Sequence, residues 1–211
     1  MTAKPFDRDG IHGFLHRPET ANGDGLVLAH GAGGNCQMPL LVAAAEAFAA
    51  TGVTVLRCDL PFRQRRPKGP PSPAGAAADR AGLKQAAAAM RELARGRVFL
   101  GGQSYGGRQA SMLAAEEPEL AAGLLLLSYP LHPPGRPKRV RTEHFPRLAV
   151  PVLFVSGTAD PFGTPDELRA AISAIPAPTR LISLDGAGHD LKRGRFDLAA
   201  VVEALHELGG R

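Results

Sequence analysis

Short apolar segments alternate with longer amphipathic segments along the chain. Most of the apolar segments lack a polar–apolar alternation, which is typical of strands buried on both faces of a parallel sheet. The longer segments carry apolar residues at helical spacing and end near Gly or Pro. The predicted strands are residues 11–16, 26–29, 53–57, 97–100, 123–128, 151–156 and 179–184. The predicted helices are residues 37–50, 76–95, 105–117, 165–174 and 196–208.

The alternation of strands and helices predicts a single α/β domain over residues 1–211. We expect a three-layer sandwich around a mostly parallel sheet of about six or seven strands, with residues 11–16 as a first, edge strand. Right-handed crossovers bring the carboxyl ends of parallel strands to one edge, where ligands bind. Six side chains directly follow predicted strands and should share this edge: His30, Asp59, Ser104, Tyr129, Asp160 and His189.

The sequence Gly102-Gln103-Ser104-Tyr105-Gly106 lies between a predicted strand and a predicted helix. In such a G-x-S-x-G turn the serine takes a strained conformation and its hydroxyl is pushed out of the sheet. Glycine fits two residues before and after the serine, because a Cβ there would clash with neighbouring backbone. The positive end of the following helix favours negative charge at the hydroxyl. We interpret Ser104 as a candidate nucleophile; the alternative is a glycine-rich turn with an incidental serine.

A serine hydroxyl becomes a good nucleophile when a base takes its proton and a third group orients the base. His189 is the preferred base, because it lies in a loop bracketed by glycines after the last strand. Asp160, which follows a buried strand, is the preferred orienting carboxylate. The alternatives are His30, His132 and His144 for the base and Asp59 and Asp185 for the carboxylate.

Backbone N–H groups are the expected donors to a tetrahedral oxyanion. One should be the N–H of Tyr105, which follows the nucleophile, and the other that of Ala32 in the sequence Gly31-Ala32-Gly33. A phosphate-binding loop is the rival interpretation of these glycines. It fails on spacing, because position 36 holds Cys36 where the dinucleotide motif requires glycine.

Composition narrows the class of protein. The chain has 211 residues, 44% apolar and 21% charged, which is ordinary for a soluble globular domain. It has neither an apolar run long enough to span a membrane nor an N-terminal apolar region typical of a signal peptide, so a cytoplasmic location is expected. Cys36 and Cys58 should then be reduced, buried residues.

The net charge of +5 is concentrated in two Pro-rich segments. Residues 61–75, the first basic loop, carry +4, and residues 131–147, the second basic loop, also carry +4. The prolines and the scarcity of apolar residues in the first basic loop predict no regular structure there. A positive rim could attract an anionic substrate, whereas 5% aromatic content without Trp argues against nucleic acid. The candidate substrate-binding residues are His30, Gly33, Arg63, His132, Arg141 and His144, although His30 is also expected to brace its own loop.

The motifs HGAGG, GGQSYGG, VSGTADPFGTPDEL and GAGHD together resemble the α/β-hydrolase fold superfamily from about residue 26 to the C-terminus. Within it, SYPLHPPGRP, RTEHFPRL and GTADPFGT are similar to small, lid-less members grouped with Tex30/KANL3-like and dienelactone-hydrolase-like proteins. The resemblance implies a minimal cap and puts Ser104, Asp160 and His189 on the triad positions, in the chain order nucleophile, acid, base. Dienelactone hydrolases proper use cysteine, so their substrate is not carried over. KANL3-like members of higher organisms are subunits of a chromatin-modifying complex.

These features predict a serine hydrolase that cleaves a carboxylic ester or thioester of a small substrate through an acyl-enzyme, without metal or cofactor. The alternative is an interaction protein that keeps the fold with little turnover, an interpretation that the basic, Pro-rich loops favour. The expected partner is a small ester or acyl substrate, for which the basic loops favour an anion, with no nucleic acid and no membrane. The sequence leaves the identity of the substrate and the oligomeric state open.

Overall fold

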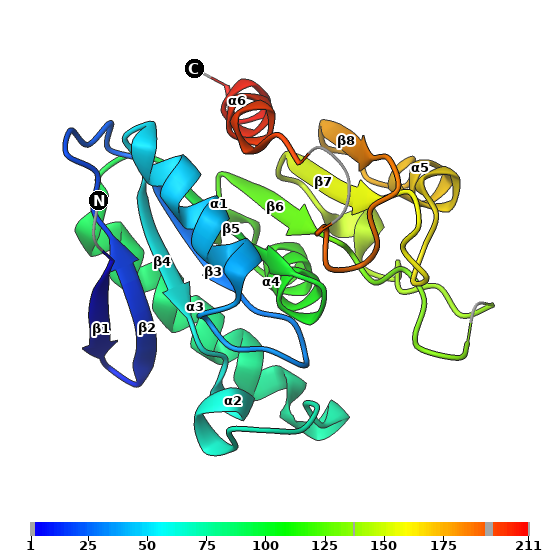
Figure 1. The fold of residues 1–211 in the computed structure, drawn as a ribbon, viewed down its shortest axis with the longest axis horizontal. Coiled ribbons are helices and arrows are strands. Elements are labelled where there is room, and N and C mark those ends of the chain that lie inside the picture. The colour runs from blue at the N-terminus through cyan, green and yellow to red at the C-terminus, as the bar shows by residue number, and fades with distance from the viewer. Residues whose placement is uncertain (1–2, 137, 193–195, 211) are drawn as a thin grey trace.

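An eight-stranded sheet organises the computed structural model, which describes residues 3–136, 138–192 and 196–210. The strands lie in the order β1-β2-β4-β3-β5-β6-β7-β8 across the sheet (Figure 1). Their bounds are β1 Lys4–Arg8, β2 Ile11–His16, β3 Gly25–Ala29, β4 Thr54–Cys58, β5 Val98–Gln103, β6 Gly123–Leu127, β7 Val152–Gly157 and β8 Thr179–Leu184.

The strands from β3 to β8 are parallel, and an N-terminal hairpin extends the sheet beyond them. β1 pairs antiparallel with β2, and β2 pairs antiparallel with β4. The prediction that residues 11–16 form the edge strand is therefore wrong, because β1 occupies that edge. β1 reads KPFDR and carries no strand signal: Phe6 packs against the core, and the other four side chains are exposed.

Helices cover both faces of the sheet, which confirms the predicted sandwich (Figure 1). α3 (Ala76–Leu93) and α4 (Tyr105–Glu116) pack on one face, and α1 (Pro39–Ala50) and α6 (Leu198–Leu208) pack on the other. α5 (Pro165–Ile172) lies beside β8.

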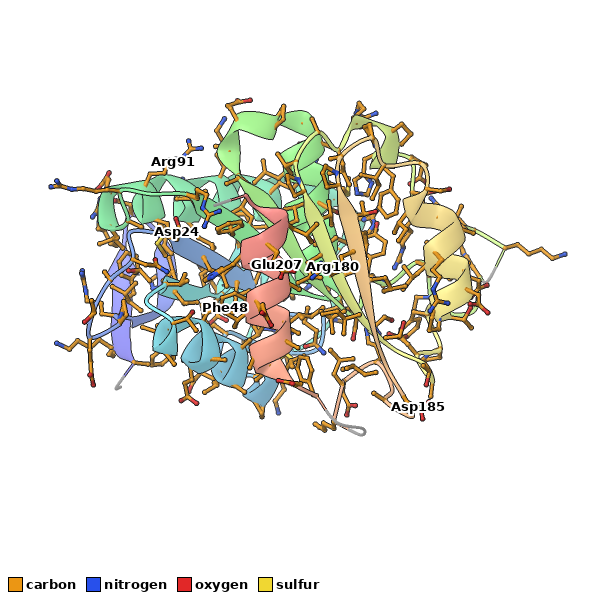
Figure 2. All side chains as sticks on the ribbon, turned by 90° about the horizontal axis from the view of Figure 1, so that it is seen from above. Asp24, Phe48, Arg91, Arg180, Asp185 and Glu207 are labelled. Carbon is orange, nitrogen blue, oxygen red and sulfur yellow. The ribbon has the colours of Figure 1, made fainter. Side chains whose placement is uncertain are left out.

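Side chains tie α6 to its neighbours on the second face. Phe48 of α1 lies next to His206 of α6, with ring centroids 6.5 Å apart. Arg180 of β8 pairs with Glu207 of α6 at 2.7 Å between Nη1 and Oε2 (Figure 2). Arg180 and Glu207 are about half exposed, so the buried apolar residues of α6 are what hold the last helix on the sheet.

The first basic loop contains regular structure, contrary to the prediction. α2 (Pro61–Arg65) begins with Pro61, which is tolerated at the first helical position because its missing N–H would be unpaired there anyway. The side chain of Phe62 is buried in the core, and that of Arg63 is buried as well, so two of its five residues hold the helix in place. Ser72 then caps a short 3₁₀ turn, Pro73–Gly75. The second basic loop likewise ends in a 3₁₀ turn, Phe145–Arg147.

Several predicted helix ends shift by a few residues. Thr164 caps α5 in a capping box with Glu167, and α5 ends at Ile172 and not at position 174 as predicted. α6 begins at Leu198, because the Asp197 carboxylate accepts the first free N–H groups of the helix. The predicted glycine-bracketed loop that contains His189 extends to Gly194, and residues 193 and 194 lie outside the described residues. In the described part of the chain, no helix has the length and apolar character needed to cross a bilayer.

Candidate functional site

Ser104 lies at the turn between β5 and α4 with φ 51° and ψ −113°, a strained conformation for a residue with a side chain. Its N–H donates to the carbonyl oxygen of Leu127 at 2.8 Å, which ties the turn to β6. A Cβ on Gly102 would lie 2.2 Å from the carbonyl oxygen of Ala29, and a Cβ on Gly106 would lie 2.6 Å from that oxygen. Glycine is therefore required at both positions by the close approach of β3.

The imidazole of His189 lies between Ser104 and Asp160. Its Nε2 is 2.8 Å from Ser104 Oγ, and its Nδ1 is 2.8 Å from Asp160 Oδ2. The Asp160 side chain is 1% exposed, and its other oxygen accepts the N–H of Phe162 at 2.9 Å. The His189 side chain is 24% exposed, which leaves its ring open to a ligand.

Two adjacent loops at the carboxyl edge of the sheet hold Asp160 and His189. Asp160 follows β7 and His189 follows β8. The N–H of Ala159 donates to the carbonyl oxygen of Ala187 at 2.9 Å, so the backbones of the two loops are joined. The ring of Phe162 stands edge-on to the imidazole, with centroids 4.5 Å apart. The orientation of the imidazole is thus set by a carboxylate on one side and an aromatic ring on the other.

The alternative carboxylates have other partners. Asp185 lies exposed beyond the end of β8, and its Oδ1 accepts from Thr158 Oγ1 at 3.3 Å (Figure 2). Asp59 accepts the N–H of Cys36 at 2.7 Å. Within the described residues neither carboxylate bonds to His189, so the geometry favours Asp160 among the three candidates.

The loop that follows β3, residues 30–38, runs beside Ser104 and is called the β3 loop here. A Cβ built on Gly31 would lie 3.6 Å from the Cβ of Ser104. Ala32 follows and is half-buried. Tyr105 is the first residue of α4, so its N–H has no partner within the helix. The two backbone N–H groups named from the sequence therefore belong to segments that flank the serine.

His30 braces the β3 loop from the interior. Its Nδ1 is 2.8 Å from the carbonyl oxygen of Gly31, and its Nε2 is 3.1 Å from the N–H of Leu60. A neutral ring protonated at Nδ1 satisfies both contacts, and burial lowers the pKa of His30, which favours the neutral form. The side chain is fully buried, which corrects the prediction that it contacts substrate.

Arg63 also turns inward, contrary to the prediction that it meets substrate. The side chain is buried, and its guanidinium donates to four backbone carbonyls. Nε donates to Gly34 at 2.7 Å, and Nη2 donates to Ala32 at 2.9 Å. The other two acceptors are the carbonyl oxygens of Gly69 at 3.1 Å and Arg66 at 3.2 Å. Arg63 therefore joins the β3 loop to the first basic loop.

The two histidines of the second basic loop are buried as well, which corrects their predicted contact with substrate. His132 lies 3.2 Å from Glu167 of α5 through its Nε2 and is 6% exposed. His144 lies 2.8 Å from Ser111 Oγ of α4 through its Nε2 and is 4% exposed. Burial lowers the pKa of His144 to about 4, so its ring is neutral at pH 7. Both side chains fasten the loop to helices.

Gly33 and Arg141 keep exposed surface. Gly33 is exposed, and the space beside its Cα is open. Arg141 is partly exposed, and its Nη1 lies 3.4 Å from the carbonyl oxygen of Pro130. The carbonyl oxygen of Arg141 accepts from the Tyr129 hydroxyl at 2.5 Å, which fixes the backbone at the base of the second basic loop. Contact of Gly33 and Arg141 with substrate stays a prediction.

Two further side chains lie at the site without having been singled out from the sequence. Gln103 Nε2 donates to the carbonyl oxygen of His189 at 3.3 Å, and Phe162 packs on the imidazole. Gln103 could have been identified from its place inside the G-x-S-x-G motif, whereas Phe162 carries no such signal.

Both cysteines are buried. Burial raises the pKa of both Cys36 and Cys58 to about 12, so both thiols stay protonated at neutral pH. Within the described ranges, no group of three or more His, Cys, Asp or Glu side chains could hold a metal ion. Ser104 lies beside the His189 imidazole, so the geometry favours it as the candidate nucleophile over either buried cysteine.

The family model for the alpha/beta hydrolase domain matches residues 22–207. The chain belongs to this family. Among solved structures, the hydrolase is similar to Est1E from Butyrivibrio proteoclasticus at 19% identity and a TM-score of 0.73, over 98% of this chain and 97% of that one. It is similar to XC6422 from Xanthomonas campestris, a serine hydrolase without lid. The sequence identity is 19% and the TM-score is 0.73, over 98% of this chain and 92% of that one.

A dienelactone hydrolase from Anabaena variabilis is also similar, at 22% identity and a TM-score of 0.70, over 98% of this chain and 95% of that one. At such identities these likenesses show the α/β-hydrolase fold alone. They agree with the resemblance that the motifs indicate, to small lid-less serine hydrolases and to dienelactone hydrolases. Est1E is also known with ferulic acid bound.

Proposed function

We propose that this alpha/beta hydrolase is a serine esterase or thioesterase that works through an acyl-enzyme. The observation that carries the proposal is the position of the His189 imidazole, within hydrogen-bond distance of both Ser104 Oγ and Asp160 Oδ2. A nucleophile, a base and a group that orients the base are what covalent acyl transfer requires. The family and the neighbouring structures support the hydrolase class, and the roles of these three residues are the proposal.

The hydrogen-bond partners define the tautomer that the reaction needs. An ionised Asp160 only accepts hydrogen bonds, so Nδ1 of His189 carries the ring proton. Nε2 then presents a lone pair to the Ser104 hydroxyl, which donates to it. When Nε2 takes a proton, the buried carboxylate stabilises the imidazolium that forms.

In the acylation step, Ser104 Oγ attacks the carbonyl carbon while its proton passes to His189 Nε2. The oxyanion accepts hydrogen bonds from the N–H groups of Ala32 and Tyr105, and the N-terminus of α4 favours its charge. His189 then gives the proton to the departing alcohol or thiol, which leaves an ester on Ser104. A water deprotonated by the same ring attacks this ester and releases a carboxylic acid and the free serine.

The connection between β6 and β7 favours open access to Ser104. Where larger members of the fold insert a lid, this chain has only the second basic loop between β6 and β7. Arg141 on that loop is partly exposed, and arginine suits a carboxylate on the substrate. Ferulic acid, the ligand bound to Est1E, is an aromatic carboxylic acid, so esters of carboxylic acids are the class to test first.

Hydrolysis of p-nitrophenyl butyrate and of a butyryl thioester by the wild type and by Ser104→Ala tests the proposal. We expect a burst of p-nitrophenol followed by steady turnover in the wild type. In the variant kcat should fall by a factor on the order of 10³ or more, because the nucleophile is removed. Equal rates in both proteins would contradict the proposal. A wild type without turnover on either substrate would favour the interaction-protein alternative.

A further inference from the structure

Arg63 is a buried arginine in a loop whose other basic side chains face solvent. It is 7% exposed, whereas Arg65 on the same short helix is exposed and makes no side-chain hydrogen bond in the described part of the chain. Burial of a charged group costs free energy unless its donors are satisfied. The structure satisfies Arg63 with backbone carbonyls, and the nearby Phe62 ring lies 5.0 Å below its guanidinium carbon.

The four carbonyls divide evenly between two segments. Ala32 and Gly34 belong to the β3 loop, at 2.9 Å and 2.7 Å from the guanidinium. Arg66 and Gly69 belong to the first basic loop, at 3.2 Å and 3.1 Å. A planar guanidinium with five donors can hold both segments at once, which a lysine ammonium cannot do with the same geometry. Within the described residues no carboxylate forms an ion pair with Arg63, so the backbone supplies its acceptors.

Ala32 is fixed on both sides by these contacts. His30 Nδ1 donates to the carbonyl of Gly31, which sets the plane of the peptide between Gly31 and Ala32. Arg63 donates to the carbonyl of Ala32, which sets the plane of the next peptide. A trans peptide is planar, so the N–H of Ala32 points opposite to the Gly31 carbonyl. The plane that carries this N–H is set by His30 and by the N–H of Gly34, which also donates to the Gly31 carbonyl at 3.1 Å. Arg63 holds the carbonyls of Ala32 and Gly34, and so fixes the backbone that follows this peptide, although Gly33 and Gly34 are conformationally permissive.

We propose that Arg63 is a positioning residue for the oxyanion site. It holds the N–H of Ala32 in place before the reaction, and it makes that placement depend on the conformation of the first basic loop. This inference rests on the proposed function, in which the N–H of Ala32 stabilises the oxyanion. Donors that are already oriented need no reorganisation when charge develops, so their loss affects the transition state more than the bound substrate.

The test compares Arg63→Ala with Arg65→Ala, which removes the same charge from the same helix. With p-nitrophenyl butyrate as a neutral substrate, kcat of Arg63→Ala should fall by about 10- to 100-fold. This fall is no larger than the one expected when an oxyanion donor is removed outright. KM should change by less than about threefold, because ground-state binding is not the affected step. Arg65→Ala should keep both constants. Affinity for a trifluoromethyl ketone, whose adduct with serine carries an oxyanion, should fall in parallel with kcat, while affinity for butyrate stays constant.

Arg63→Lys keeps the charge and most of the side chain, and it carries the test if Arg63→Ala does not unfold cooperatively on heating. We expect an intermediate kcat, because one ammonium cannot hold both segments. Trypsin should also cleave after Lys68 faster in Arg63→Lys than in the wild type, since the carbonyl of Gly69 loses its donor. The same comparison of trypsin cleavage, made in a Ser104→Ala background, reports on this contact independently of ester hydrolysis by the protein.

Three outcomes would overturn the inference. The first is that both Arg63 variants have the same kcat as Arg65→Ala. The second is that the affinity of Arg63→Ala for butyrate falls as much as its affinity for the ketone. The third is that trypsin cleaves Arg63→Lys after Lys68 no faster than the wild type. Each of these leaves the proposed function intact, provided that the wild type hydrolyses the ester. A wild type that neither hydrolyses the ester nor binds the ketone would instead contradict the proposed function itself, and the positioning role with it.

Discussion

Asp160 and His189 are 29 residues apart in the chain and meet at 2.8 Å between Oδ2 and Nδ1. The carboxylate is almost fully buried, so the contact is shielded from water. If it fixes the tautomer of His189, Asp160→Asn should lower kcat by a factor of about 10³ to 10⁴, because an amide can donate to Nδ1 and place the ring proton on Nε2. The measurement is kcat for p-nitrophenyl butyrate from pH 6 to 9.

The matched control for this variant is Asp185→Asn. Asp185 is the neighbouring carboxylate that the sequence left as an alternative, and it is exposed and bonded to Thr158. We expect its replacement to leave kcat within about twofold, since surface substitutions of this kind have small effects. If Asp185→Asn lowered kcat as much as Asp160→Asn, the assignment of Asp160 as the orienting group would be wrong.

Gly102→Ala should destabilise the fold. The new Cβ would lie 2.2 Å from the carbonyl oxygen of Ala29, and φ at Gly102 is +156°, so β3 and β5 would have to separate. Overpacking against backbone predicts a loss of at least about 2 kcal/mol in the free energy of unfolding, measured with urea. Gly33→Ala serves as the control, because the space beside Gly33 is open. Similar unfolding midpoints for the two variants would contradict the tight packing of the turn.

His144 should make the fold sensitive to acid. Its folded-state pKa of about 4 lies below its ordinary value because the ring is buried and Arg108 and Arg147 repel its protonated form, whereas Glu143 attracts it. As the pH falls, His144 therefore takes up a proton in the unfolded chain before it does so in the folded protein. The contribution of neutral His144 to the free energy of unfolding is present above about pH 6.5 and is lost toward pH 4. The pKa difference corresponds to about 3 kcal/mol.

Urea unfolding at pH 7 and pH 4 tests this contribution. In His144→Gln the drop in the free energy of unfolding between the two pH values should be smaller than in the wild type by about 2–3 kcal/mol. Glutamine keeps a donor for Ser111 Oγ and does not titrate. An identical drop in both proteins would show that other groups, such as the buried His16 and His30, account for the acid sensitivity.

Thr164→Ala should lower the free energy of unfolding by about 1 kcal/mol. The Thr164 hydroxyl accepts the N–H of Glu167 at 3.3 Å, and the Glu167 carboxylate accepts the N–H of Thr164 at 2.8 Å, so the variant loses one half of the capping box. Thr20→Ala is the control, since Thr20 is exposed at a bend outside the helices and strands. Equal unfolding midpoints for the two variants would show that the cap does not stabilise α5.

The sequence could predict the layers, the parallel strands and the edge at which Ser104, Asp160 and His189 meet. Those features follow from apolar patterning and from the handedness of crossovers, which act over many residues at once. β1 could not be predicted, because pairing with β2 holds it in place and a single residue, Phe6, faces the core. Strands of that kind depend on their neighbour more than on their own pattern.

The roles of Arg63, His132 and His144 could not be predicted either. A sequence shows that these residues are charged or titratable, but it does not show which carbonyls or hydroxyls lack a partner inside the fold. Arg63 turns inward because the carbonyls of two loops converge on it, and His144 does so because Ser111 of α4 faces it. The basic charge of a loop is therefore a poor guide to what its side chains bind.

Phosphonylation by a fluorophosphonate probe tests the central claim most directly, because the reaction needs an activated serine and no knowledge of the substrate. Intact mass and the mass of the tryptic peptide 98–108 locate the adduct. The account predicts one adduct, on Ser104, which is absent in Ser104→Ala and forms much more slowly in Asp160→Asn. An unlabelled wild type beside a labelled control hydrolase, or an adduct on any other residue, would contradict it.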